Sequence, residues 1–298
     1  MADRMADWVA SMRAGDYHAA WDLTQQDLAE RDPVRRDDPA LPYHLRWVWD
    51  GRSYEDRHCL VRCYHGLGDS IQFARFLPLL ARRTRILTVE VQARLRDLFV
   101  SGLDCPGVRF VAFDEAHPLP PAECDLEITE LDFALRATPA DAKPAYLTAK
   151  AGPLPPGSVG LCYGAGDWDR DRAVPSSLLA PLCSEARCVT LMPEATTLDV
   201  LNPSGCPFDM METAALVAAA DLVITVDTMI AHMAGAMGKP AWLLLKAEPD
   251  WRWPAGGGRT PWYPSMRIYA QPRPGDWAPV VERVRSDLAQ WNAERKEG

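Results

Sequence analysis

Residues 4–33, "RMADWVASMRAGDYHAAWDLTQQDLAERDP", carry apolar side chains at the spacing of α-helices. The apolar positions are Met5, Trp8, Val9 and Met12, followed by Ala19, Ala20, Leu23 and Leu28. Gly15 separates the two sets, and glycine commonly ends a helix. The pattern therefore predicts a helical hairpin at the start of the chain, within residues 1–40.

From residue 58 onward, short apolar runs alternate with segments of helical periodicity. The runs that predict strands are "HCLVRCY" (58–64), "RILTVEVQ" (85–92), "VRFVAFD" (108–114) and "DLEITE" (125–130). The helix after the first run should be kinked by Pro78, which lacks an amide donor. This succession predicts a parallel sheet with helices on both faces.

A second alternation follows a proline-rich segment, residues 138–158, which we interpret as a linker. Its predicted strands are residues 159–164, 187–192, 221–227 and 240–246, and its predicted helices are residues 176–186, 211–220, 228–238 and 277–296. The fold class expected is α/β, with two Rossmann-like parallel-sheet domains, 41–150 and 151–298, facing a cleft that binds the ligand.

The composition is that of a soluble globular protein. Of the 298 residues, 48% are hydrophobic and 24% are charged, and the net charge of −9 argues against a nucleic-acid partner. The eight cysteines form no CxxC pair, so we expect no metal site and a reducing cytoplasm. The first residues contain acids and no long apolar core, and no apolar run is long enough to cross a membrane.

The first candidate for chemistry is "HGLGD", at the predicted carboxyl end of the first strand. Gly66 and Gly68 allow a tight turn and a close approach of the backbone to a ligand. Asp69 follows at the expected helix start, where aspartate is a favoured cap. A carboxylate there is also suited to accept a proton from a substrate hydroxyl, so both interpretations remain open.

The second candidate is "DLVITVDTMIAHMAGAMG", residues 221–238. Asp227 ends a buried strand, Thr228 opens a helix, and His232 lies about one turn further along. Free amides at such a helix start favour an anion, which suggests a diphosphate beside Thr228. The alternative is that Asp227 caps the helix and His232 is a core residue.

A third set of polar residues follows other predicted strands of the second domain. Arg172, in "GAGDWDRDRAVP", can neutralise phosphate, whereas Arg170 and its acidic neighbours suit a solvated charge run. Glu194, in "LMPEATT", can bind ribose hydroxyls or simply lie in a surface loop. We find no GxSxG, HExxH, GxxxxGK[ST] or GxGxxG motif.

Together these segments resemble a known family. The stretches "GLGDSIQFARFLPLL", "VEVQARLRDLF", "VGLCYGAG", "DLVITVDTMIAHMAGAMGKPAWLLL" and "PDWRW" with "PWYPSMRIYAQPRPGDW" are similar to bacterial glycosyltransferases related to the ADP-heptose:lipopolysaccharide heptosyltransferases. The resemblance covers roughly residues 40–296, and the initial hairpin is similar to one degenerate tetratricopeptide unit.

The resemblance implies the GT-B fold and inverting sugar transfer from a nucleotide-diphosphate sugar to a carbohydrate or protein hydroxyl, with no obligatory metal and no cofactor. By position it implies that Asp69 is the general base and that Thr228, with Asp227 and His232, lies at the donor diphosphate. Arg172 stands where the family has a basic residue three positions before a proline, often lysine. The segment "LLKAEPDWRW" departs from the heptosyltransferases and leaves the donor sugar open.

Two other functions fit the same sequence. A nucleotide-sugar 2-epimerase shares the fold and needs no acceptor. A catalytically degenerate domain would bind a nucleotide or a protein partner without transferring sugar.

Overall fold

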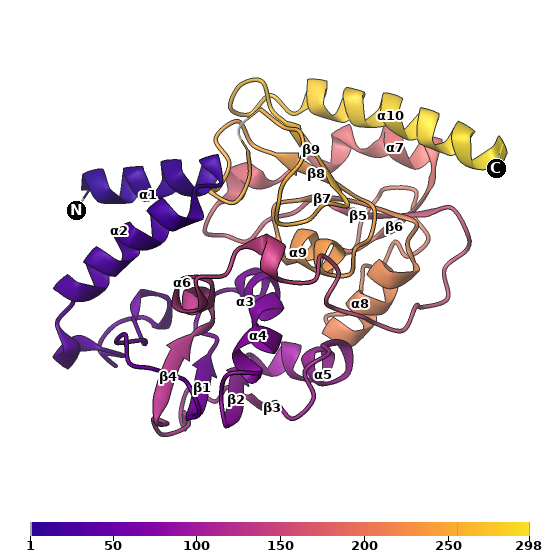
Figure 1. Cartoon of the computed structure of the whole chain (residues 1–298). Coiled ribbons are helices and arrows are strands. Elements are labelled where there is room, and N and C mark those ends of the chain that lie inside the picture. Colours follow the sequence, from indigo (N-terminus) through magenta and orange to yellow (C-terminus); the bar gives the residue numbers. More distant parts are fainter. Residues whose placement is uncertain (1, 255, 298) are drawn as a thin grey trace. The chain divides into compact units, whose positions relative to one another are not determined.

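The computed structural model describes residues 2–254 and 256–297 (Figure 1). Contacts between residues divide the chain into two compact units, Met1–Leu147 and Thr148–Gly298, called here unit 1 and unit 2. Each unit contains one parallel β-sheet.

Unit 1 begins with the predicted hairpin, in which α1 (Ala2–Ala14) and α2 (Tyr17–Glu30) lie side by side (Figure 1). Asp16 caps α2 by accepting a hydrogen bond from the Ala19 N–H. Trp21 of α2 is buried, and the Arg136 guanidinium lies 5.9 Å from the centre of its ring. The hairpin therefore packs on the sheet-bearing part of unit 1.

The sheet of unit 1 has the strand order β3-β2-β1-β4. The strands are β1 (His58–Arg62), β2 (Ile86–Val91), β3 (Arg109–Ala112) and β4 (Cys124–Glu127). The helices after the hairpin are α3 (Leu67–Phe73), α4 (Leu77–Ala81), α5 (Ala93–Gly102) and α6 (Leu131–Leu135), with short 3-10 turns at Pro33–Arg35, Tyr43–Leu45, Ala74–Phe76, Ile128–Glu130 and Pro139–Asp141. The break between α3 and α4 falls just before Pro78, as the proline predicts.

Strands β1, β2 and β4 of this sheet have one apolar face and one polar face. Paired residues of neighbouring parallel strands share a face, and side chains alternate along each strand. The register aligns Arg62 of β1 with Glu90 of β2 and Glu127 of β4, and aligns Leu60 with Asp125. These charged side chains are all buried, so ionic partners must compensate for their loss of water.

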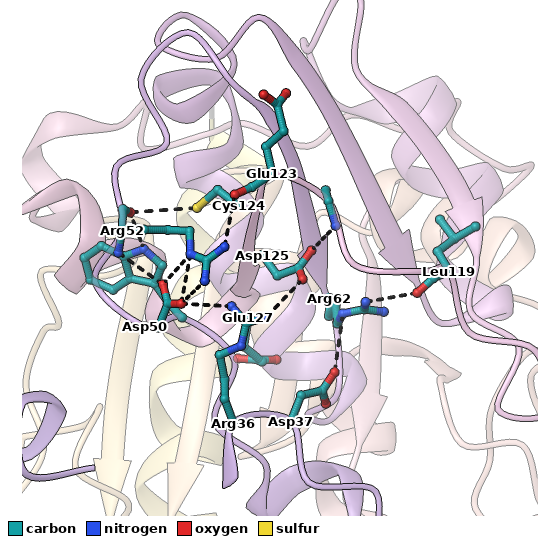
Figure 2. A network of polar contacts seen from close by, with 12 residues as sticks. Arg36, Asp37, Asp50, Arg52, Arg62, Leu119, Glu123, Cys124, Asp125 and Glu127 are labelled. Atoms are coloured by element: carbon teal, nitrogen blue, oxygen red, sulfur yellow. Dashed lines mark hydrogen bonds and ion pairs between the residues drawn. The ribbon is translucent and has the colours of Figure 1, made fainter. Parts of the chain in front are cut away.

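A network of ion pairs supplies that compensation (Figure 2). Arg62 Nη1 lies 2.8 Å from Glu90 Oε2, and its Nη2 donates to the Leu119 carbonyl at 3.0 Å. Asp37 and Arg36, from the segment between α2 and β1, approach Arg62 and Asp125 at 3.8 Å each. Burial raises the pKa of Asp125 and of Glu90, although nearby arginines oppose the shift.

The sheet of unit 2 has five strands in the order β6-β5-β7-β8-β9. They are β5 (Ser158–Cys162), β6 (Arg187–Thr190), β7 (Leu222–Val226), β8 (Ala241–Leu245) and β9 (Met266–Ala270). The helices are α7 (Ala180–Glu185), α8 (Met210–Ala219), α9 (Met229–Ala236) and α10 (Ala278–Glu297), and 3-10 turns lie at Arg170–Arg172 and Ser176–Leu178. In Figure 1, α7 and α10 lie on one side of this sheet, and α8 and α9 on the other.

Two local predictions for unit 2 were wrong. The sequence pattern did not predict β9, because it lies within a loop rich in proline and tryptophan. The helix predicted over residues 176–186 is shorter, because Ser176–Leu178 form a 3-10 turn and α7 begins at Ala180, with Leu179 as its N-cap. Among the helices of the described residues, none combines the length and the apolar character that crossing a membrane requires.

Candidate functional site

The candidate residues of unit 1 lie where its sheet topology reverses. β2 pairs with one side of β1 and β4 with the other, so the topological switch point is between β1 and β4. Ligands of open parallel sheets bind outside the carboxyl ends of strands at such points. The chain leaves β1 there through residues 63–66, and β4 ends there at Glu127.

Asp69 lies in the first turn of α3, and its carboxylate fixes the start of the helix. Its Oδ2 accepts a hydrogen bond from the Gly66 N–H at 3.1 Å, and Gly66 itself is the N-cap. The prediction that Asp69 occupies the cap position was therefore wrong by three residues, although the carboxylate still satisfies a free helical donor. A Cβ at Gly66 would lie 3.2 Å from the same Oδ2, and Gly68 lies within the first turn.

His65 directly precedes this helix start. Its Nδ1 lies 3.0 Å from Oε1 of Glu127, and the exposed fractions of the two side chains are 30% and 1%. The same Oε1 accepts a hydrogen bond from the Tyr64 N–H at 3.1 Å. The His65 carbonyl in turn accepts a hydrogen bond from Nε2 of Gln92, the residue after β2. Three strand ends thus fix the loop that carries His65.

Unit 2 has its own switch point, between β5 and β7. Arg172 lies in the 3-10 turn after β5, and its Nη1 donates to the Asp227 carbonyl, at the end of β7, at 2.6 Å. Its guanidinium also lies 4.3 Å from the centre of the Trp168 ring, which is 77% exposed. Arg172 and Asp227, both predicted site residues, are therefore brought together.

A cavity of about 170 Å³ opens beside Arg172. It is lined by Trp168, Asp169, Arg172, Asp227, Leu245, Lys246, Glu248, Pro249 and Asp250. Lys246 Nζ lies 2.8 Å from Asp169 Oδ2, and Arg172 Nε lies 3.6 Å from the same oxygen. Arg252 pairs with Asp250 at 2.8 Å. These contacts neutralise part of the acidic charge around the cavity.

Asp227, which lines this cavity, has a raised pKa. Burial, followed by the nearby Asp250 carboxylate, raises the pKa of Asp227 to about 6, and Arg172 opposes the shift. The carboxyl therefore takes up a proton within the range of ordinary laboratory buffers.

Thr228 is the N-cap of α9, and its Oγ1 accepts a hydrogen bond from the Ile230 N–H at 3.3 Å. The helix starts at the same strand end as Asp227, so its free amides face the carboxyl edge of the sheet. Thr228 is half-buried. Thr228, not Asp227, therefore caps α9.

His232 and Glu194 have different surroundings. His232 is buried, its Nδ1 lies 2.9 Å from the Tyr263 hydroxyl, and its ring packs on Trp253. These contacts are those of a core histidine, the alternative raised by the sequence. Glu194 is exposed in the turn that follows β6.

Sequence reasoning missed Lys246, Asp169, His65 and Glu127. Two of them had a usable signal: Lys246 ends the apolar run "PAWLLLK", and Glu127 lies at the end of "CDLE". The carboxyl-end rule would have selected both. Asp169 was assigned to a solvated charge run because its partners are distant in sequence. Within residues 2–254 and 256–297, no group of three or more His, Cys, Asp or Glu side chains is placed to hold a metal ion.

Two parallel-sheet α/β units, each with polar residues at its switch point, have the architecture of the GT-B fold. A family model described as "Glycosyltransferase family 9 (heptosyltransferase)" matches residues 205–286. The resemblance to this family inferred from the sequence motifs is thereby confirmed over residues 205–286.

Solved structures confirm the fold. TibC of enterotoxigenic E. coli, described as a dodecameric iron-containing heptosyltransferase in complex with ADP-D-beta-D-heptose, has a TM-score of 0.56 and 14% identity over 80% of this chain and 78% of that one. E. coli ADP-heptose lps heptosyltransferase II has a TM-score of 0.52 and 16% identity over 79% and 99% of the two chains.

A curated relative is more similar in sequence. Protein FlbA of Caulobacter vibrioides is 27% identical over an alignment 292 residues long. The aligned part covers 82% of this chain and 48% of the relative. The chain thus spans about half the length of the curated relative it matches.

Proposed function

We propose that the chain is a glycosyltransferase that moves a sugar from a nucleotide-diphosphate sugar to an acceptor hydroxyl, with inversion and without an obligatory metal. The family match and the ADP-heptose bound to TibC support a nucleotide-sugar donor. The observation that carries the proposal is the cavity at the unit 2 switch point, which is lined by Arg172, Lys246 and Asp227, the residue before the N-cap of α9. Two cations and a set of free amides suit a diphosphate.

The donor diphosphate would lie between Arg172 and the amides that follow Thr228. Arg172 is held by the Asp227 carbonyl, so its planar group is oriented before the ligand arrives. As the bond between the anomeric carbon and the diphosphate oxygen breaks, negative charge grows on the leaving group. Arg172, Lys246 and the helix start would stabilise that charge.

The acceptor would be activated in unit 1. A hydroxyl oxygen attacks the anomeric carbon, a new carbon–oxygen bond forms, and the hydroxyl proton passes to a base. We assign the role of that base to Asp69, whose carboxylate lies in the first turn of α3, after the end of β1. Attack and departure on opposite sides of one carbon invert its configuration.

The proposal is tested by two assays in order. Thermal unfolding with ADP, UDP, GDP and their sugars shows which donor class binds, because a ligand of the folded state raises Tm. The best donor is then incubated with candidate hydroxyl acceptors, and release of nucleoside diphosphate is compared with formation of glycoside. Equal amounts of both products support transfer. Binding of a donor without a glycosylated product from any acceptor would contradict it.

A further inference from the structure

A second cavity of unit 2 lies beside β9, the edge strand of the sheet. Its volume is about 630 Å³, and its lining residues differ from those of the cavity beside Arg172. A hollow of this volume is in the range that encloses small-molecule ligands. The lining residues are Gly256, Gly258 and Arg259 of the loop before β9, Arg267, Ile268 and Tyr269 of β9, and Arg283, Ser286 and Asp287 of α10.

The side chains around this cavity carry an excess of positive charge. Three of them are arginines and one is an aspartate, whereas the net charge of the whole chain is −9. Charges of one sign around a hollow raise the local potential, because the protein wall has a low dielectric constant. The cavity is therefore suited to attract an anion.

Asp287 neutralises one of the three arginines, Arg267. Its Oδ2 lies 2.6 Å from Nη2 of Arg267 and accepts a hydrogen bond from the Tyr269 hydroxyl at 2.8 Å. Burial raises the pKa of Tyr269, so the hydroxyl keeps its proton and acts as the donor. The Arg267 guanidinium also lies 4.8 Å from the centre of the Tyr269 ring. These three side chains form a cluster without net charge in the wall of the cavity.

The other two arginines are held by backbone carbonyls. Arg283 Nη2 donates to the Ala270 carbonyl at 2.7 Å, and Arg259 Nη1 donates to the Pro264 carbonyl at 3.1 Å. Within the part of the chain that the structure describes, neither arginine forms an ion pair. A carbonyl orients a guanidinium without neutralising it and leaves further N–H donors for a ligand. Two positive charges thus remain at the cavity.

The loop that carries Arg259 is fixed to the edge of β9. The Ile268 N–H donates to the Gly258 carbonyl at 2.9 Å, and the Gly258 N–H donates to the Ile268 carbonyl at 3.3 Å. Gly258 has a φ of 112°, a backbone conformation that favours glycine. Arg259 and Arg283 are therefore positioned by different elements around one hollow, which reduces the ordering cost of binding.

We propose that this cavity is a second anion site of the chain and binds the phosphate group of a small soluble phosphate ester. A phosphate monoester carries a charge of about −1.5 to −2 at pH 7, which matches the charges of Arg259 and Arg283. Guanidinium groups bind phosphate oxygens through paired hydrogen bonds, and Ser286 adds a hydroxyl at the same wall. The rest of the hollow accommodates the organic part of the ligand. The inference goes beyond sugar transfer and does not depend on it.

The test is calorimetric titration of the full chain at low salt with inorganic phosphate and with glucose 6-phosphate. We expect both to bind and glucose, the uncharged control, not to bind. Arg259→Gln and Arg283→Gln should each weaken binding by about 10-fold, because each removes a charged partner of the phosphate. Arg285→Gln is the matched control, since Arg285 is on the same helix but pairs with Glu282 at 2.8 Å and Glu185 at 3.0 Å. It should change the affinity by less than about twofold.

The titrations are repeated with Arg172→Met, because the proposed donor cavity also suits phosphate. We expect the binding that depends on Arg259 and Arg283 to persist in this variant. Loss of all phosphate binding in Arg172→Met would assign the anion to the donor cavity and overturn the inference. Failure of both phosphates to bind the wild-type chain would do the same, as would wild-type affinity in the Arg259→Gln, Arg283→Gln double variant.

A further measurement locates the ligand without a substitution. In NMR spectra of the chain made with isotope-labelled glycine, glucose 6-phosphate should shift the amide signals of Gly256 and Gly258, which line the cavity. The signal of Gly164, which follows β5, should not move. Shifts at Gly164 with none at Gly256 and Gly258 would contradict the assignment.

Vesicles that contain phosphatidic acid distinguish a lipid headgroup from a soluble ligand. We expect the chain not to sediment with these vesicles beyond the level seen with the Arg259→Gln, Arg283→Gln double variant. Sedimentation that needs both arginines, without binding of glucose 6-phosphate, would contradict a soluble ligand. Each of these outcomes leaves the proposed sugar transfer to be judged by its own assays.

Discussion

Arg172 shows how a single side chain can combine several contacts at a strand end. Its guanidinium donates to the Asp227 carbonyl, approaches Asp169 and stacks on the exposed Trp168 ring. An arginine held by a carbonyl and an aromatic face keeps other N–H groups in a defined direction. The chemistry proposed for both units depends on a few such residues whose positions are set by neighbouring strands.

Replacing Asp69 by Asn tests the carboxylate of unit 1. The amide can no longer accept a hydrogen bond with full negative charge, so we expect the transfer rate to fall by about 100-fold with donor binding unchanged. The rate is measured by glycoside formation at saturating donor. Asp141→Asn is a suitable control, because Asp141 also caps a helical turn by accepting the Thr138 N–H at 2.8 Å. Equal rates for Asp69→Asn and wild type would remove Asp69 from the site.

The raised pKa of Asp227 predicts a pH effect on nucleotide binding. Above its pKa of about 6 the carboxylate adds negative charge to the cavity, and below it the neutral form does not. Diphosphate binding should therefore tighten as pH falls through 6, more in wild type than in Asp227→Asn. Calorimetric titrations at pH 7.5 and 5.5 give, for each protein, the ratio of its diphosphate affinities at the two pH values. Protonation of the ligand affects both proteins equally, so a difference between their ratios is due to Asp227. The same ratio in both proteins would contradict the prediction.

The raised pKa of Asp227 also makes the stability of the folded state depend on pH. Its folded pKa lies above its ordinary value of 3.8, so the folded state binds the proton more tightly than the unfolded chain. The contribution is present at low pH and is lost as pH rises through the folded pKa of about 6.

At the scale of elements, the polar face of the unit 1 sheet is the feature that most departs from a typical parallel sheet. Such sheets are usually apolar on both faces. Here Arg62, Glu90 and Asp125 are buried on one face. Arg62 and Asp125 pair with Asp37 and Arg36 of the segment between α2 and β1, and Arg62 also pairs with Glu90. The pairs tie that segment to β1 and β4, and tie β1 to β2, at specific positions.

Replacing Arg62 by Leu tests this arrangement. Glu90, which is 1% exposed, would lose its cationic partner at 2.8 Å. We expect the free energy of unfolding to fall by about 3–5 kcal/mol, because a buried charge is left uncompensated. Urea unfolding followed by circular dichroism measures the change.

A matched surface variant separates this effect from a general loss of charge. Arg96 pairs with Asp97 at 2.7 Å, and both side chains are about half exposed or more, at 49% and 66%. Arg96→Leu should change stability by less than about 1 kcal/mol. Similar losses in the two variants would show that burial of the Arg62 pair is not what matters.

At the scale of the whole molecule, the alternation of apolar runs was sufficient to predict two parallel-sheet units. Buried parallel strands are short and apolar, so runs such as "DLVITVD" can be recognised as strands from the sequence. The strand β9 escaped prediction because its burial depends on pairing with β8 and not on its own flanks. The polar face of the unit 1 sheet was not predicted either. The charged side chains in "HCLVRCY" and "DLEITE" have partners that are distant in sequence.

Some residues of the candidate site could likewise be predicted from the sequence, and others could not. Asp69, Arg172, Asp227 and Thr228 could be selected from the sequence because each follows an apolar run and matches a family motif. The Lys246–Asp169 and His65–Glu127 contacts could not, because each joins residues more than 60 positions apart. Only the sheet order brings their strand ends together.

The central claim is that a nucleoside diphosphate binds at the switch point of unit 2 through Arg172. Calorimetric titration of the nucleotide that stabilises the wild-type chain most should be repeated with Arg172→Met and with Arg170→Met. Arg170 lies in the same 3-10 turn but is exposed and pairs with Asp167. The account predicts a loss of affinity of about 30-fold, or about 2 kcal/mol, for Arg172→Met and none for Arg170→Met. Equal affinity of wild type and Arg172→Met would contradict it.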